Sequence, residues 1–158
     1  YQRYWEGLSL AERACGAWLN SFSSVIAFCS NAPEKRSAVL RFQLILSRMM
    51  SLLLCISMCE VSELDHTHFT HLDLNSVDLD PQSLAHLDAI DDPTAKQKVV
   101  LQWIQRLIVD HSRNGVLDIA PPILTRAFQE LTIGHTHFID ANKVTAVPFP
   151  FAFAQMVW

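Results

Sequence analysis

The sequence predicts an all-α protein, on three observations. Only four glycines occur in 158 residues, and long stretches contain neither glycine nor proline, whereas β-hairpins need turn residues at short intervals. Apolar residues recur at spacings of three and four, the period of an amphipathic helix. Half of the residues are hydrophobic, so a chain of this length buries a sizeable core without disulfide bonds. We therefore expect a single helical region over residues 1–158, with a polar linker at 62–80.

The first predicted helix covers residues 1–30. A capping box from Ser9 to Glu12 would also allow a break near Gly7, and the Asn-Ala-Pro sequence of residues 31–33 ends the helix. Its apolar positions form one stripe: Leu10, Ala14, Ala17, Trp18, Phe22, Val25 and Phe28.

The second predicted helix, residues 34–59, is apolar nearly all round, and residues 43–59 are the internal candidate for a membrane span. The leucines and isoleucines of this stretch favour insertion by roughly 2–4 kcal/mol in total, whereas a central Arg48 costs roughly 2.5–3.5 kcal/mol. Since these terms cancel, we predict a helix that is buried against protein.

The second half of the chain contains further helices. Asp80 and Pro81 supply an N-cap and a first-turn proline for a short helix that ends near residues 91–93. A longer helix covers residues 94–113, and the Asn114-Gly115 pair stops it. One face of the longer helix is marked by Val100, Trp103, Ile104, Leu107, Ile108 and His111.

The last predicted helix begins at Pro121-Pro122 and continues to about residue 138. An apolar segment follows from residue 147. Because the sequence opens on Tyr1 and closes within this apolar segment, we expect an excerpt that is truncated at both ends.

Composition and charge exclude two classes of protein. Only 18% of the residues are charged, too few for a disordered chain of this hydrophobicity. The sequence contains twelve lysines and arginines and sixteen aspartates and glutamates, which gives a net charge of −4. The densest basic cluster is Lys35-Arg36. Binding to nucleic acid through phosphate neutralisation is therefore not expected.

The cysteines and histidines form no pattern typical of a metal site. Cysteines 15, 29, 55 and 59 include no CxxC motif, and we interpret them as small buried side chains in a reducing compartment. His66, His68 and His71 lie close in sequence, but a His-x-His pair diverges on a helix and no HExxH motif accompanies it. We expect solvated histidines in the linker, and a histidine-based metal protein remains an alternative.

Motifs for catalysis are also lacking. The sequence contains no glycine-rich phosphate loop, no GxSxG elbow and no Cys/His signature. The acidic pair Asp91-Asp92 precedes Pro93, where N-capping of the next helix explains it. We predict that the protein is not an enzyme.

Several motifs follow one another in an order that resembles a known channel family. Residues 1–7, Tyr-Gln-Arg-Tyr-Trp-Glu-Gly, resemble the end of a second membrane segment, and residues 36–59 resemble a buried cytosolic helix. The Trp103 helix and the helix start at residues 122–124, Pro-Ile-Leu, come next. Residues 147–155, Val-Pro-Phe-Pro-Phe-Ala-Phe-Ala-Gln, resemble the entry into the next membrane segment. Together these motifs resemble the bestrophin-like anion channels.

This resemblance implies a homopentameric channel for chloride or similar monovalent anions, with this chain forming mostly the cytosolic helical part of one subunit. Ile123, after the helix-starting Pro122, would form the pore constriction, where a hydrophobic ring passes weakly hydrated anions most easily. Helix N-termini facing the pore would favour anions despite the negative net charge. The membrane-junction motif would comprise Arg3, Trp5, Glu6, Pro150 and Gln155.

The same resemblance sets the remaining expectations. The full-length protein would be an integral membrane protein in contact with lipid, with this segment on the cytosolic side or on a stromal or matrix-like side. No cofactor is expected, and regulation by Ca²⁺ would use a site outside this segment. The rival prediction is a soluble helical interaction module with no transport role. Sequence that flanks residues 1 and 158 would discriminate between them, as long apolar spans under the first and polar sequence or stop codons under the second.

Overall fold

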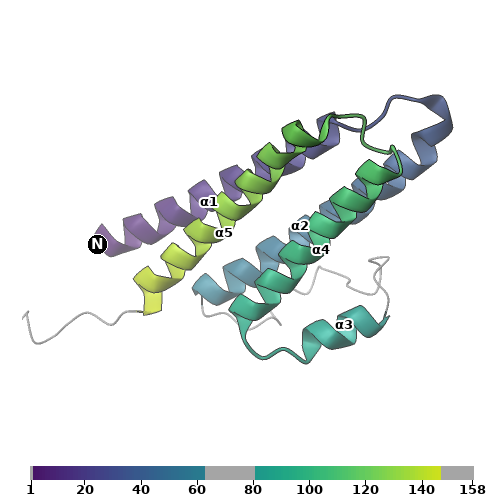
Figure 1. Ribbon diagram of the computed structural model, residues 1–158. Coiled ribbons are helices and arrows are strands. Elements are labelled where there is room, and N and C mark those ends of the chain that lie inside the picture. The colour runs from purple at the N-terminus through teal and green to yellow at the C-terminus, as the bar shows by residue number, and fades with distance from the viewer. Residues whose placement is uncertain (1, 63–80, 147–158) are drawn as a thin grey trace, which may run out of the picture.

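The computed structural model describes residues 2–62 and 81–146, and it confirms the all-α prediction for them (Figure 1). Pro150, Gln155 and the three linker histidines lie outside these residues. The described elements are the α-helices α1 (Gln2–Ala27), α2 (Arg36–Ser62), α3 (Pro81–Asp88), α4 (Pro93–Arg113) and α5 (Pro121–Ala146), with the 3₁₀-helix η1 (Pro33–Lys35).

Several helix bounds differ from the prediction. α2 ends at Ser62 rather than residue 59, and α3 ends at Asp88 rather than near residues 91–93. α1 is unbroken at Gly7 and ends at Ala27, because residues 28–30 leave the helix to pair with residues 116–118. α5 continues to Ala146 rather than residue 138. No proline lies between residue 122 and Pro148 to stop it, and Gly134 is tolerated inside the helix.

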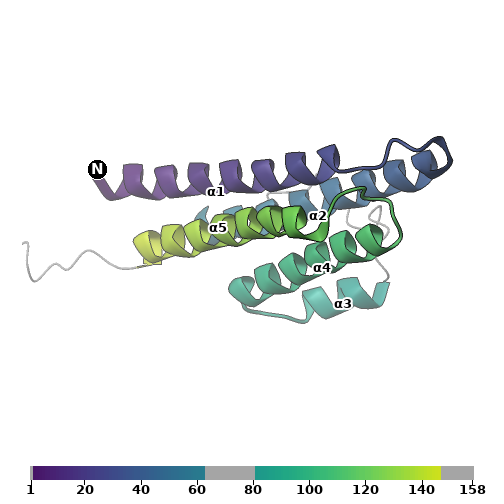
Figure 2. The same ribbon diagram turned by 45° about the horizontal axis from the view of Figure 1, so that its top comes forward.

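The helices form two antiparallel pairs. α1, the first helix, lies along α5, the last, and α2 lies along α4 (Figures 1 and 2). Much weaker contacts join α1 to α2. One apolar core connects the pairs, and its largest fully buried aliphatic and aromatic side chains are Phe42, Leu46, Leu53, Ile104, Ile108, Leu131 and Phe138.

The loops between α1 and η1 and between α4 and α5 meet at one end of the bundle, which we call the loop end. Ser30 N donates to Val116 O at 2.8 Å, and Asp118 N donates to Phe28 O at 2.8 Å. Gly115 has a φ of 67°, a conformation that favours glycine. Its carbonyl accepts a hydrogen bond from Lys35 Nζ at 2.7 Å. These bonds fix the point from which α5 starts.

The start of α4 follows the predicted capping. The Asp92 carboxylate accepts hydrogen bonds from Thr94 N at 3.1 Å and Ala95 N at 3.2 Å, and Pro93 opens the helix. The acidic residue before Pro93 therefore satisfies orphan amides of the first turn.

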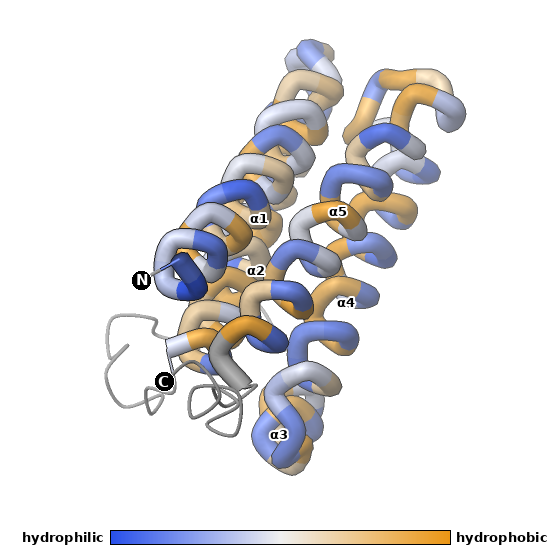
Figure 3. Tube along the Cα trace, turned by 90° about the vertical axis from the view of Figure 1, so that its left-hand side faces the viewer, coloured by the Kyte–Doolittle hydropathy of each residue, from blue (hydrophilic) through white to orange (hydrophobic). Residues whose placement is uncertain are grey.

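The other described helices cover only one side of α2. Hydrophobic residues occupy much of this helix (Figure 3), and among the described residues Pro33–Ser62 is the one stretch whose length and composition would let it cross a membrane. Its inner face supplies core residues such as Phe42 and Leu53. Its outer face leaves four large apolar side chains exposed, namely Leu40, Leu44, Leu54 and Met58.

Candidate functional site

Close contacts between Trp18 and α5 hold α1 and α5 together. Trp18 Nε1 donates to Leu131 O at 3.0 Å, and its ring stacks on Phe138 with centroids 4.8 Å apart. The ring lies directly over Gly134, where an added Cβ would be only 2.3 Å from it. Ser21 Oγ donates to Ala127 O at 2.8 Å. The two helices are therefore fixed in a single register.

The start of α1 and the end of α5 lie together, at what we call the junction end (Figure 1). The Arg3 guanidinium donates to the Val144 carbonyl, and Gly7 packs close to the Val144 side chain. Trp5 is 50% exposed and meets Tyr4 edge to face, with ring centroids 5.8 Å apart. Glu6 is exposed. Arg3, Trp5 and Glu6 thus share the end of the pair from which residues 147–158 continue.

Ile123 belongs to the opposite end of α5. It lies in the first turn of α5, and its amide donates to Ala120 O at 3.0 Å. The side chain is 49% exposed, whereas the neighbouring Leu124 is buried in the core. At 1.5 Å per residue, Ile123 lies about 30 Å along the helix from Val144. The structure therefore separates Ile123 from Arg3, Trp5 and Glu6 by the length of the bundle.

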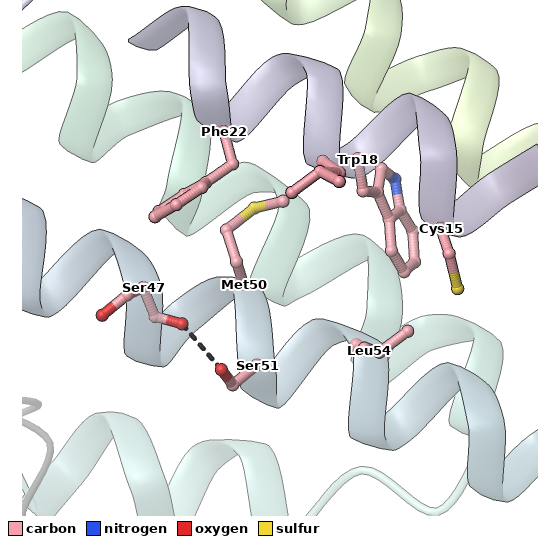
Figure 4. A pocket seen from close by; sticks show the side chains of 8 residues that line it. Cys15, Trp18, Phe22, Ser47, Met50, Ser51 and Leu54 are labelled. Carbon is pink, nitrogen blue, oxygen red and sulfur yellow. Dashed lines mark hydrogen bonds between the residues drawn. The ribbon is translucent and has the colours of Figure 1, made fainter. Parts of the chain in front are cut away.

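An apolar groove lies between α1 and α2, with a volume of about 250 Å³. Figure 4 shows side chains from both helices pointing into it. The α1 wall consists of Cys15, Trp18, Leu19 and Phe22, and the α2 wall consists of Ser47, Met50, Ser51 and Leu54.

The serine hydroxyls of the groove are hydrogen-bonded to their own helix, and its cysteine is unreactive. Ser47 Oγ donates to Leu44 O and Ser51 Oγ donates to Ser47 O, both at 2.9 Å. Burial raises the pKa of the Cys15 thiol, so this sulfur is a thiol rather than a nucleophilic thiolate at neutral pH. The groove is therefore suited to apolar surface and offers little for catalysis.

A second surface is the outer face of α5, the side turned away from the core. Its exposed residues over about three turns are Thr125, Arg126, Gln129, Thr132, Ile133 and Thr136, and Arg126 is the one charged side chain among them. Thr132 Oγ1 donates to Phe128 O and Thr136 Oγ1 donates to Thr132 O, both at 3.0 Å. Because these hydroxyls bond to their own helix, the threonines leave their methyl groups for outside contacts.

A polar cluster ties the end of α2 to the start of α4. The Glu60 carboxylate accepts hydrogen bonds from Thr94 Oγ1 at 2.8 Å and from Gln97 Nε2. Gln97 is 1% exposed, and its Oε1 has no partner. Within residues 2–62 and 81–144, no group of three histidine, cysteine or acidic side chains is placed to hold a metal. This cluster is a packing contact between two helices.

The cysteines follow the prediction of small buried side chains only in part. Cys59 is buried, whereas Cys15, Cys29 and Cys55 are half-buried. Burial, with a smaller contribution from the neighbouring Cys59, raises the pKa of Cys55 to about 11. Because both effects raise its pKa, the Cys55 thiol is protonated at neutral pH.

Sequence reasoning missed the groove and the α5 face. Trp18 and Phe22 were assigned to one core stripe, yet Trp18 packs on α5 and both line the groove. Leu19 could have indicated an apolar surface outside the core, because it falls outside that stripe. The near-continuous apolar surface of α2 could have indicated the same, since a helix needs only one apolar face to join a core.

The chain matches no family model, no curated protein and no solved structure. Function is therefore inferred from the sequence motifs and the geometry described above.

Proposed function

We propose that this chain is the mostly cytosolic helical part of one subunit of a bestrophin-like, homopentameric channel. The channel passes chloride or a similar monovalent anion passively across a membrane. Its subunits contact lipid through segments that adjoin residues 1–7 and 147–158.

One observation carries the proposal. The motif of residues 1–7 lies at the start of α1, and the motif of residues 147–155 follows directly on α5 in the sequence. The Arg3 guanidinium contacts the Val144 carbonyl where these two helices meet. A protein that leaves a membrane at residues 1–7 and re-enters it after residue 147 needs these ends side by side, although they are more than 140 residues apart. The α1–α5 pairing supplies that arrangement.

The exposed position of Ile123 supports its assignment to the pore constriction. An apolar side chain that projects from the first turn of α5 is available to line an axis shared by several subunits. A ring of such residues resists wetting and favours weakly hydrated anions. The start of α5 adds positive partial charge without a lysine or arginine.

Anion efflux from lipid vesicles that contain the full-length protein tests the proposal. We expect passive chloride efflux, with iodide passing faster than chloride. Ile123→Ala widens the ring, so the preference for iodide should fall at least several-fold. The control is Ile90→Ala, the same truncation at a half-buried residue in the turn between α3 and α4. Assembled protein without efflux would contradict the proposal, and equal selectivity in the two variants would contradict the role of Ile123.

The apolar groove between α1 and α2 favours a second candidate, a soluble helical interaction module with no transport role. Such a module would use the groove to bind a partner, and the sequence that flanks residues 1 and 158 would then be polar. Long apolar segments on both sides would exclude this candidate.

A further inference from the structure

The groove between α1 and α2 belongs to a larger apolar surface, which we call the α1–α2 edge. It consists of the groove and the exposed side chains beside it, Leu40, Leu44, Met58 and the outer part of Leu19. Leu19 is 65% exposed. From Leu40 to Met58 the edge runs about 27 Å along α2. An exposed apolar surface of this extent typically marks an interaction site.

Lipid is a poor occupant for this edge. Arg41 is exposed beside Leu40, and Arg48 is half-buried within the same helix. An arginine costs roughly 2.5–3.5 kcal/mol in the centre of a membrane span. A protein surface can accept these side chains at its rim, whereas hydrocarbon cannot. The edge therefore favours a protein partner.

The outer face of α5 has the chemistry that the edge requires. Exposed helix faces normally carry charged residues, yet between Thr125 and Ile139 the only acidic or basic side chains apart from histidine are the exposed Arg126 and the half-buried Glu130. Thr132 and Thr136 present methyl groups, and Ile133 is an exposed aliphatic residue. A single helix face of this kind fits between two helices, as in ridges-into-grooves packing.

We infer that the partner is a second copy of this chain, and that the outer face of α5 of one copy packs into the α1–α2 edge of the next. This heterologous contact covers both unpartnered surfaces at once. A two-fold contact between two α1–α2 edges would leave the α5 face exposed. Repeating a heterologous contact around an axis closes a ring. The inference deepens the proposed function and rests on it for the expectation that copies assemble.

In projection, the edge supplies roughly two thirds of the area that a stable contact needs. Two helices about 10 Å wide and about 27 Å long present roughly 500 Å² in projection. The true buried surface is larger because side chains interlock, and a stable interface buries about 800 Å² on each partner. Each subunit in a ring contributes both surfaces, so it takes part in two such contacts.

Cysteine cross-linking of the full-length protein tests the inference. Two versions with different tags are co-expressed, one with Leu19→Cys in the edge and one with Thr132→Cys on the α5 face, and are treated with a short bismaleimide. We expect a product that carries both tags. All versions also carry Cys15→Ser, because Cys15 lines the same edge. Pairs in which both versions carry Leu19→Cys, or both carry Thr132→Cys, should then give no product beyond that of the remaining native cysteines. A chain with both substitutions should give a ladder of products.

A charge in the edge provides an independent measurement. Leu19→Glu should convert the assembly to monomers on a sizing column while helicity is retained, because the side chain is mostly exposed within one subunit. Ala85→Glu, an exposed site on α3, is the matched control and should leave the assembly intact. Unchanged assembly of Leu19→Glu would overturn the inference. A product from two Leu19→Cys chains would also overturn it, as would the lack of a mixed product from cysteine versions that assemble as the wild-type protein does.

The outcomes separate this inference from the proposed function. A ladder that stops at a number other than five supports the interface and contradicts the pentamer. A complete ladder from a protein without chloride efflux supports the interface and contradicts transport.

Discussion

The two sides of α1 contact their neighbours in opposite ways. Toward α5, the Trp18 ring lies on Gly134 and Phe138 and donates a hydrogen bond to Leu131. Toward α2, an apolar groove remains and Leu19 is largely exposed. The α5 side of α1 thus fixes the geometry within one chain, whereas the α2 side is the one that we propose for contact with a second copy.

The largest effect is expected when Trp18 is truncated. Trp18→Ala removes a buried ring and should lower the free energy of unfolding by about 3–5 kcal/mol. Trp5→Ala is the matched control, because Trp5 is half exposed and makes its ring contact with Tyr4. Chemical denaturation of the purified full-length protein measures both. A similar decrease in the free energy of unfolding for both variants would show that Trp18 does not hold α1 and α5 together.

A methyl group added to Gly134 should also weaken the α1–α5 contact. In Gly134→Ala the new Cβ would meet the Trp18 ring at 2.3 Å, and overpacking of this kind costs about 1–3 kcal/mol. The midpoint of thermal unfolding should fall accordingly. Combining Gly134→Ala with Trp18→Phe should recover part of the loss, since a smaller ring leaves room; no recovery would contradict the close approach.

The same substitution on the open side of α1 should have the opposite sign. An added Cβ at Gly16 meets nothing within 4 Å, and alanine is favoured over glycine inside a helix by roughly 0.5–1 kcal/mol. Gly16→Ala should therefore raise the unfolding midpoint slightly. A loss comparable to that of Gly134→Ala would show that this side of α1 is packed within the subunit.

The smallest expected effect is a pH dependence from His135 on α5. Burial of its imidazole, helped by the positive charge of Lys98, lowers the pKa of His135 from 6.5. The unfolded chain then binds the proton more readily, so the contribution of His135 to stability is present above pH 6.5 and is lost as pH falls through the lower folded value. Unfolding midpoints measured from pH 7.5 to 5 should show this loss. It should be absent in His135→Gln, and an unchanged pH profile in that variant would assign the dependence to other groups.

Much of the helical fold could be predicted, since it depends on local signals. Pro33, Asp92-Pro93, Asn114-Gly115 and Pro121-Pro122 mark the helix ends within a few residues. The end of α5 was placed too early, because no breaking residue marks it before Pro148. Pairing of α1 with α5 was also beyond local reasoning. It depends on Trp18 meeting Gly134, and neither residue indicates its partner.

The candidate site also has features that local sequence signals predict and features that depend on helix packing. The place of Ile123 in the first turn of α5 follows from the Pro121-Pro122 start, whereas its exposure beside the buried Leu124 does not. The contact between Arg3 and Val144 does not follow from sequence spacing, because it arises from the register of two helices at opposite ends of the chain. The α1–α2 edge exists because α2 has more apolar surface than α4 and α5 cover, which only the packed arrangement reveals.

The central claim is that the junction end of the α1–α5 pair lies at a bilayer while the loop end lies in water about 30 Å away. Nitroxide labels at Tyr4→Cys, in the junction end, and at Asn31→Cys, an exposed site at the loop end near Ile123, test this claim in full-length protein reconstituted into liposomes. Their accessibility to oxygen and to a water-soluble nickel complex is measured. We predict that the Tyr4 label collides preferentially with oxygen, which concentrates in lipid, and that the Asn31 label collides preferentially with nickel. Equal nickel accessibility at both positions would contradict the account.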